Sequence, residues 1–252
     1  MQTHHSVPLV DSHIHLHEFD ENTIKRLCSE NYVFLAVSDD FLSSAKTVEI
    51  AKKCRNVVPA VGIHPWVIKE DINIESVVKF VSSEGVRFLG EVGLDKRFVP
   101  QTFELQLKIF KEFLEVAKTY GLGLSIHAPD AWREVLELLV RNDIKVAVFH
   151  WYTGPLDLIK EIIDAGYYIG INVAAKIQKK HIEVIGVVPL EYMVTESDGP
   201  YNYRGLLLEP SLLPDLLDII ARVKGVSTKE VKEQIWQNFL KILRIAGASL
   251  HL

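Results

Sequence analysis

Eight short apolar runs, alternating with longer amphipathic stretches, are the feature that most constrains the fold of this chain. The runs lie at residues 7–11, 32–38, 57–63, 86–91, 123–127, 145–150, 167–172 and 192–196. They are continuously apolar, as in parallel strands that are buried on both faces. Strands and helices alternating in this way form either a doubly wound open sheet or a closed barrel.

Helical periodicity is clear in several of the intervening stretches. These lie at residues 102–120, 131–141, 156–165, 214–224 and 228–246. In the first of them Phe103, Leu107 and Phe110 recur at spacings of three and four residues, which places them on one helix face. Ser227 and Glu230 form a capping-box pattern at the start of the last one. The sequence therefore predicts helices between and after the strands.

Polar residues of the kind that bind metals stand at the ends of five apolar runs. They are His13 and His15 after the first run, Glu91 at the fourth, His127 at the fifth, His150 at the sixth and Asp198 after the eighth. A closed barrel brings all strand ends to one mouth, whereas an open sheet usually separates its first and last strands. A barrel of this kind typically takes about 250 residues. We therefore predict an α/β fold, a single TIM-type (β/α)8 barrel that comprises residues 1–252 as one domain.

The spacing of these residues predicts a site for metal ions. His13 and His15 are two residues apart, so in an extended strand both imidazoles point to the same face and can bind one metal. A buried carboxylate such as Glu91 is costly unless it is paired or coordinated, and its two oxygens could bridge two cations. Pairing of Glu91 with an Arg or Lys is the alternative. His127 and His150 are candidates for a second metal.

Asp198 is the candidate catalytic base as well as a metal ligand. A metal lowers the pKa of its bound water to about 7, and a nearby carboxylate can take the released proton. Glu196 is a rival, because strand alternation points it to the same side as Asp198. His64 could contact substrate or simply be hydrogen-bonded, and Asp39 stays unassigned.

Other residues near the predicted mouth are candidate substrate contacts. The cationic candidates are Arg204 and Lys176. Trp66, Trp151 and Tyr201 could stack on a nucleobase, although aromatic residues in such loops more often serve packing.

The composition of the chain bears on its binding partners and its cellular compartment. The net charge of −5 argues against a broad electrostatic grip on nucleic acid. Two cysteines, Cys28 and Cys54, do not make a disulfide framework in a chain this long, so we expect free thiols in a reducing compartment. The first residues lack the pattern of a signal peptide, and no apolar stretch is long enough to cross a bilayer. We expect a cytoplasmic protein with no membrane contact, and no protein partner is evident.

At this point the chain resembles a known family, the TatD-type metal-dependent hydrolases. The matching residues include 11–16 (Asp-Ser-His-Ile-His-Leu), 62–65 (Gly-Ile-His-Pro), 90–95 (Gly-Glu-Val-Gly-Leu-Asp), 195–201 (Thr-Glu-Ser-Asp-Gly-Pro-Tyr) and 238–239 (Asn-Phe). The resemblance implies a TIM-type barrel with two divalent cations, for which Zn, Mn, Mg, Fe or Ni would suit. It implies that His13, His15 and Asp198 hold one cation, that His127 and His150 hold the other, and that Glu91 bridges them.

The implied activity is hydrolysis of phosphodiester bonds by metal-activated hydroxide, as in a deoxyribonuclease of the 3′ exonuclease type. A single-stranded DNA end would then be the substrate. One alternative is an amidohydrolase-like enzyme that acts on a small-molecule amide, ester or lactone. The other is a non-catalytic barrel that only retains a metal or serves as an interaction protein, and the complete ligand set argues against it. One departure bears on the choice: the family usually has an Arg two residues after the histidine of the fifth strand, and this chain has Pro129 there.

Overall fold

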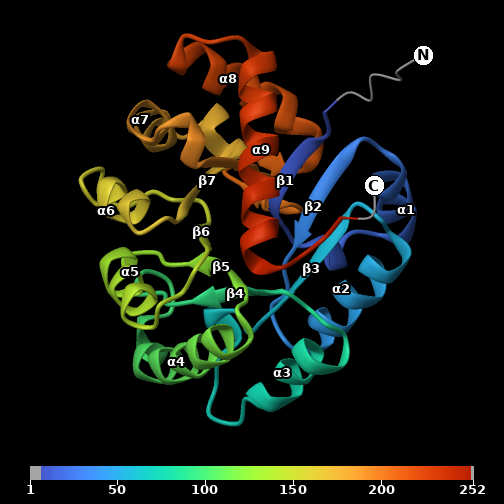
Figure 1. Ribbon diagram of the computed structural model, residues 1–252, viewed down its shortest axis with the longest axis vertical. Helices are drawn as coiled ribbons and strands as arrows, with labels where there is room; N and C mark the ends of the chain where they lie inside the picture. Colours follow the sequence, from blue (N-terminus) through green and yellow to red (C-terminus); the bar gives the residue numbers. More distant parts are fainter. Residues whose placement is uncertain (1–6, 251–252) are drawn as a thin grey trace.

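Eight parallel strands form the centre of the molecule. A computed structural model describes residues 7–250. The strands are β1 (Leu9–Ile14), β2 (Tyr32–Ala36), β3 (Val57–Val61), β4 (Phe88–Gly93), β5 (Gly123–His127), β6 (Ala147–Phe149), β7 (Tyr168–Asn172) and β8 (Met193–Glu196). They pair in sequence order from β1 to β8 (Figure 1). The sheet thus has the strand order of a (β/α)8 barrel.

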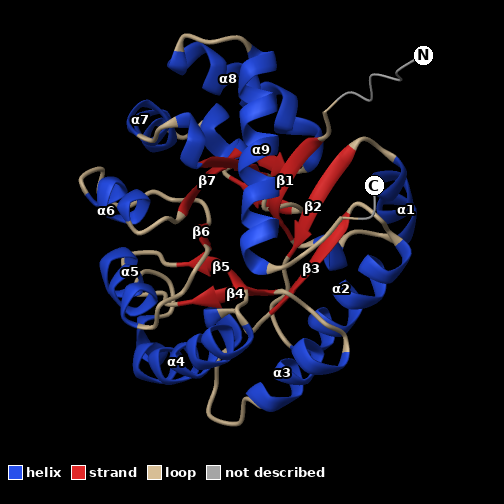
Figure 2. Cartoon of the chain, viewed as in Figure 1, coloured by secondary structure: helices blue, strands red, loops and turns tan. Residues whose placement is uncertain are grey.

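Helices surround these strands. They are α1 (Glu21–Ser29), α2 (Phe41–Lys53), α3 (Ile74–Ser83), α4 (Phe103–Tyr120), α5 (Trp132–Arg141), α6 (Leu158–Asp164), α7 (Lys179–Val187), α8 (Leu213–Lys224) and α9 (Thr228–Ala246). Figure 2 shows them as a blue outer layer around the red strands. α9 has the predicted bounds, and α4 and α5 each begin one residue after the predicted start.

The first and last strands lie side by side and nearly close the barrel. The backbone N–H of Asp198 donates to the carbonyl of His13 at 2.9 Å, and the Thr195 hydroxyl donates to the carbonyl of Val10 at 2.6 Å. β1 and β8 would lie far apart in an open doubly wound sheet. The predicted TIM-type barrel is therefore confirmed.

One end of the barrel is covered and the other carries the strand ends. α9 packs against β1, β5 and β8, and the Asn238 amide donates to the carbonyl of Met193 at the start of β8 (2.7 Å). This contact places α9 over the amino-terminal ends of the strands. The carboxyl ends, where barrel enzymes build their sites, remain at the opposite mouth.

Two strands run further than the apolar pattern indicated. The first was predicted at residues 7–11 and is Leu9–Ile14; the fourth was predicted at residues 86–91 and is Phe88–Gly93. The extra residues include His13, which is fully buried although it is polar. Because His13 is polar, the apolar pattern ends before it and cannot indicate that the first strand continues through this buried residue.

The predicted free thiols are wrong. Cys28 and Cys54 form a disulfide, with their Cα atoms 5.2 Å apart. Cys28 lies in α1 and Cys54 caps the end of α2, and both belong to a small apolar cluster beneath these helices. Their proximity comes from packing of α1 and α2 against neighbouring strands, which cysteine counting cannot reveal. The cysteines thus give no support to the expected reducing compartment.

A β-hairpin follows β8 and had not been predicted. It joins β9 (Tyr201–Tyr203) to β10 (Leu206–Leu208) through Arg204 and Gly205. Both turn residues have positive φ, 52° and 86°, as the central residues of a type I′ turn do. The hairpin carries Arg204 to its tip.

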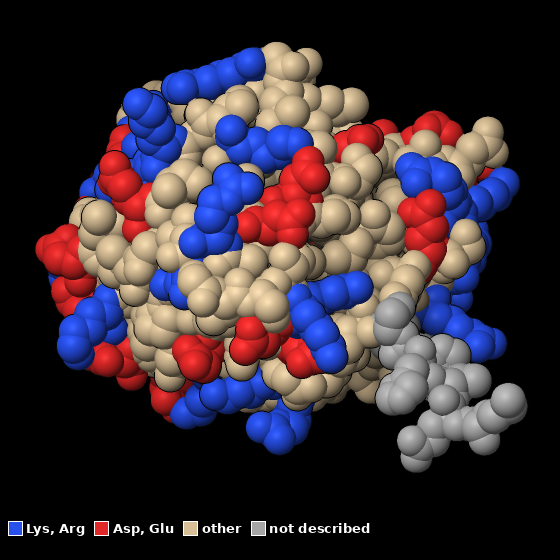
Figure 3. All heavy atoms as spheres, turned by 90° about the horizontal axis from the view of Figure 1, so that it is seen from above, with Lys and Arg blue, Asp and Glu red and all other residues tan. Residues whose placement is uncertain are grey.

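Surface charge is mixed on the face that Figure 3 displays. Lys and Arg side chains alternate there with Asp and Glu and do not form one broad basic surface. Among residues 7–250, no helix is long and apolar enough to span a bilayer.

Candidate metal centre

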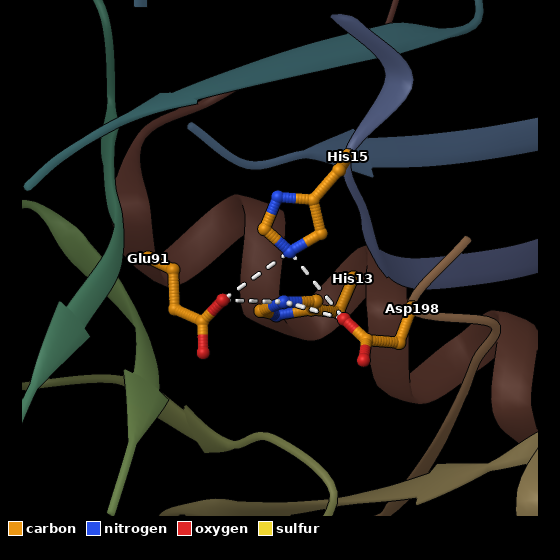
Figure 4. Close-up of side chains that lie close together, drawn as sticks. All are labelled: His13, His15, Glu91 and Asp198. Atoms are coloured by element: carbon orange, nitrogen blue, oxygen red, sulfur yellow. Dashed lines mark hydrogen bonds and ion pairs between the residues drawn. The ribbon is translucent and has the colours of Figure 1, made fainter. Parts of the chain in front are cut away.

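Four predicted ligands meet at the mouth of the barrel. They are His13 in β1, His15 just after it, Glu91 in β4 and Asp198 after β8 (Figure 4). Glu91 Oε2 lies 3.1 Å from His13 Nε2 and 3.3 Å from His15 Nε2. Asp198 Oδ1 lies 3.5 Å and 3.4 Å from the same two nitrogens. One ligand atom from each residue lies within 4.8 Å of all the others, which is compact enough to hold a cation.

The other oxygen of Glu91 faces a second group. Glu91 Oε1 lies 2.6 Å from His127 Nδ1 and 3.4 Å from His64 Nε2. His150 Nε2 is 4.0 Å from the same oxygen and 3.7 Å from Asp198 Oδ1, and its ring stacks on that of His13. Glu91 thus presents one oxygen to each of two groups, as a bridging carboxylate does.

Electrostatics keep the carboxylates of this site charged. Burial opposes ionisation of Glu91, which is 2% exposed, but electrostatic interactions with the imidazoles of His64, His13 and His127 hold its pKa well below the usual value. Burial also opposes ionisation of Asp198, yet His150 and other imidazoles lower its pKa. Desolvated charged carboxylates facing imidazole nitrogens are a donor set suited to divalent cations.

The histidines differ in protonation. Burial, together with His150, lowers the pKa of His13 and so favours the neutral imidazole, which is the form that binds metals. Burial alone would lower the pKa of His15, but contacts with Asp198, Asp39 and Glu91 raise it well above its usual value.

A carboxylate stands behind each of three histidines that are predicted metal ligands. His15 Nδ1 lies 3.2 Å from Asp39 Oδ1, His127 Nε2 lies 2.9 Å from Asp95 Oδ2, and His150 Nδ1 lies 2.9 Å from Glu196 Oε1. Partners of this kind fix the ring orientation and tautomer of metal-binding histidines, leaving the other ring nitrogen directed at the ion. The three imidazole rings are therefore oriented by carboxylates that lie on the side facing away from the candidate metal centre.

A cavity of about 770 Å³ opens above these groups. Its volume lies in the range usual for small-molecule sites, roughly 300–1,000 Å³. Aromatic side chains line it on two sides, Trp66 and Phe98 on one and Trp151, Tyr201 and Tyr203 on the other. The cavity can admit a nucleotide or another compact polar molecule.

Comparison with known proteins assigns the chain to a family. The sequence model of the family described as "TatD related DNase" matches residues 10–244. The chain belongs to the TatD family.

Relatives and solved structures agree with this membership. An uncharacterized metal-dependent hydrolase of Methanocaldococcus jannaschii, MJ1582, is 28% identical over 94% of this chain and 98% of its own length. YcfH of Escherichia coli, also named as an uncharacterized metal-dependent hydrolase, is 25% identical over 96% of this chain and 98% of its own length. The crystal structure of YjjV, a TatD homolog from Escherichia coli K12, superimposes with a TM-score of 0.80 at 20% identity and covers 93% of this chain and 97% of its own.

The predicted enzyme class is confirmed by this membership: the chain is a TatD-family metal-dependent hydrolase. The barrel brings all six predicted metal ligands to the same mouth. Of the three predicted substrate contacts, His64 and Arg204 line the cavity. Lys176 instead pairs with Asp215 and is not among the lining residues.

Several residues of the TatD site had no clear sequence signal. Asp39 follows a strand, a position that alone assigns it no role, and it contacts both His15 and His17. The sequence makes Glu196 a rival of Asp198, and the structure places it behind His150 instead. The position of Glu196 two residues before Asp198 indicates to which side of the strand its side chain points, but it does not reveal the contact with His150.

Proposed function

We propose that this TatD-family protein is a two-cation phosphodiesterase, a deoxyribonuclease that removes nucleotides from the 3′ end of single-stranded DNA. Residues 1–252 would act as one domain. The observation that carries the proposal is the position of Glu91, whose two carboxylate oxygens face two separate sets of imidazoles. The family description, a TatD related DNase, supports DNA as the substrate.

We assign the ligands of each cation from the two groups around Glu91. The first group is His13, His15, Asp198 and Oε2 of Glu91. The second is Oε1 of Glu91 with His127, completed by His150 or His64. When bound, a pair of divalent cations lowers the pKa of water and stabilises charge on the oxygens of a reacting phosphoryl group.

Asp198 is the proposed general base. Its carboxylate is ionised because the surrounding imidazoles lower its pKa, and it is 12% exposed at the floor of the cavity. It can therefore accept a proton from the water that attacks phosphorus. Glu91, nearly inaccessible to solvent, holds ligands and does not exchange protons with the cavity.

The cavity favours a strand end over a duplex. Aromatic rings on two sides offer stacking surfaces for unpaired bases, which single-strand-binding sites use. A DNA end inserted into the mouth would place a terminal phosphodiester near Glu91 and Asp198.

The test uses a 5′-labelled single-stranded oligonucleotide with Mg²⁺ or Mn²⁺. We expect the wild-type protein to shorten it from the 3′ end, and Asp198→Asn to lose about a hundredfold or more in rate. Asp164→Asn, in an exposed carboxylate at the end of α6, serves as the control and should keep full activity. Near-normal turnover by Asp198→Asn would remove its role as base. A wild-type protein that leaves DNA intact but hydrolyses a small amide, ester or lactone would replace the nuclease with the alternative enzyme.

A further inference from the structure

Arg97 stands at the cavity on a loop that is fixed to the metal centre. The backbone N–H groups of Arg97 and Phe98 donate to Asp95 Oδ1 at 2.8 Å and 2.7 Å. The other oxygen of Asp95 accepts a 2.6 Å hydrogen bond from the Trp66 indole and lies 2.9 Å from His127 Nε2. One buried carboxylate thus holds both the histidine that faces Glu91 and the loop that carries Arg97.

The guanidinium of Arg97 is held in place by Asp130. Nε donates to Asp130 Oδ2 at 2.9 Å and Nη2 donates to Asp130 Oδ1 at 2.6 Å, a bidentate pair. This pair uses two of the five N–H groups of the guanidinium and leaves three. The Arg97 side chain is 44% exposed and lines the cavity. The three remaining N–H groups of Arg97 are therefore available at the mouth of the barrel. Because Asp130 already holds the side chain, binding a ligand there costs it little further conformational entropy.

Positive charge is scarce around this cavity. Arg97 and Arg204 are the Lys or Arg residues among the described residues that line it, against five carboxylates. Arg204 sits at the exposed tip of the β9–β10 hairpin, with its guanidinium over the ring of Tyr203. Pro129, next to Asp130, offers the cavity neither charge nor a backbone N–H. Arg97 is thus the fixed cation on the side of the mouth nearest His127.

We propose that Arg97 binds a phosphate group of the substrate, beside Trp66 and Phe98, whose rings would stack on the adjoining base. This inference rests on the proposed phosphodiesterase function and names the residue that holds the non-reacting part of the substrate. Arginine suits the role because its planar fork matches the oxygens of a phosphate. The ion pair with Asp130 orients the guanidinium of Arg97 and leaves its remaining N–H groups uncovered.

The experiment compares Arg97→Met with Arg133→Met as a matched control. Arg133 in α5 makes a similar bidentate pair, with Glu161, at 3.0 Å and 3.0 Å, and its side chain is 51% exposed. It does not line the cavity. The measurements are KM and kcat on the labelled oligonucleotide, and the affinity for thymidine 5′-monophosphate by calorimetry with the metal-loaded protein.

We expect Arg97→Met to raise KM and weaken nucleotide binding about tenfold or more, with a smaller change in kcat, since a charge-assisted hydrogen bond to phosphate is lost. Arg97→Lys should recover part of the affinity, and Arg133→Met should match the wild type.

The contrary result would show that the only role of Arg97 is to form the ion pair with Asp130. In that case Arg97→Met and Asp130→Asn will lower the melting temperature by similar amounts and leave KM and nucleotide affinity within twofold of wild type. That result would overturn the inference while the wild-type nuclease activity, measured in the same assay, upholds the proposed function. A wild type that cleaves no DNA would instead defeat the proposed function.

Discussion

Glu91 Oε1 lies 2.6 Å from His127 Nδ1 in the interior of the barrel mouth. The other oxygen of the same carboxylate lies 3.1 Å from His13, so one side chain joins two groups of imidazoles. In the two-cation site that we propose, this carboxylate is shared by both cations, so its removal should affect both.

We propose two ions per chain, and Glu91→Ala should lower the bound metal from that content towards one ion or none. The reason is that each group loses a charged ligand and the remaining imidazoles face one another without compensation. Elemental analysis of protein reconstituted with Mn²⁺ or Zn²⁺ gives the content, and Glu161→Ala, in an exposed carboxylate of α6, is the control. Unchanged metal content in the Glu91 variant would defeat the bridging assignment.

His64 separates two interpretations of the second group. Sequence reasoning made it a substrate contact, but its Nε2 lies 3.4 Å from Glu91 Oε1, closer than the 4.0 Å of His150 Nε2. Burial lowers the pKa of His64, which keeps its imidazole neutral and able to bind a cation. We therefore expect His64→Ala to lower metal content as much as His150→Ala does. A His64 variant that retains all its metal but has a raised KM would return His64 to the role of substrate contact.

The part of the site that the sequence could predict is the part that strand geometry dictates. His13, His15 and His127 each follow or end an apolar run, and the carboxyl ends of barrel strands share one mouth. Their convergence therefore needs no knowledge of side-chain packing. The same logic located Glu91, Asp198 and His150 from sequence alone.

Two residues behind the predicted ligands could not be found in this way. Asp39 and Glu196 contact predicted ligand histidines that lie on other strands, so their roles depend on how neighbouring loops pack. Arg97 depends likewise on Asp130, thirty-three residues away in the chain. Contacts of this kind between distant residues produce no periodicity or fixed spacing by which a single sequence could reveal them.

The disulfide gives a prediction for stability. Cys28 and Cys54 are 26 residues apart, and closing a loop of that length restricts the unfolded chain, which stabilises the fold by about 3.5 kcal/mol. The double variant Cys28→Ala/Cys54→Ala should lose a similar free energy of unfolding, measured by urea denaturation at equilibrium. Adding a reductant to the wild type should reproduce the loss. If neither treatment changes the unfolding free energy, the two cysteines are not paired in solution and the expectation of free thiols returns.

His181 is a buried histidine outside the metal centre. It lies in α7 with its side chain inaccessible to solvent, and neither ring nitrogen has a hydrogen-bond partner among residues 7–250. Its ring stacks in parallel with that of Trp151, which lines the cavity. Burial, and to a smaller extent the charge of His150, lowers the pKa of His181 to about 3.

This lowered pKa predicts how stability changes with pH. The folded state keeps His181 neutral, whereas the unfolded chain takes up a proton near the ordinary pKa of about 6.5. Stability from this residue is thus fully present above pH ~6.5 and falls as the pH drops towards 3, by about 1.4 kcal/mol per pH unit. His181→Leu removes the titrating group and two unpaired buried nitrogens, so at pH 8 it should be at least as stable as the wild type. Between pH 8 and pH 5 the wild type should lose about 2 kcal/mol more unfolding free energy than the variant. Equal losses, measured by denaturant titration at both pH values, would mean that His181 has a partner or solvent access in solution.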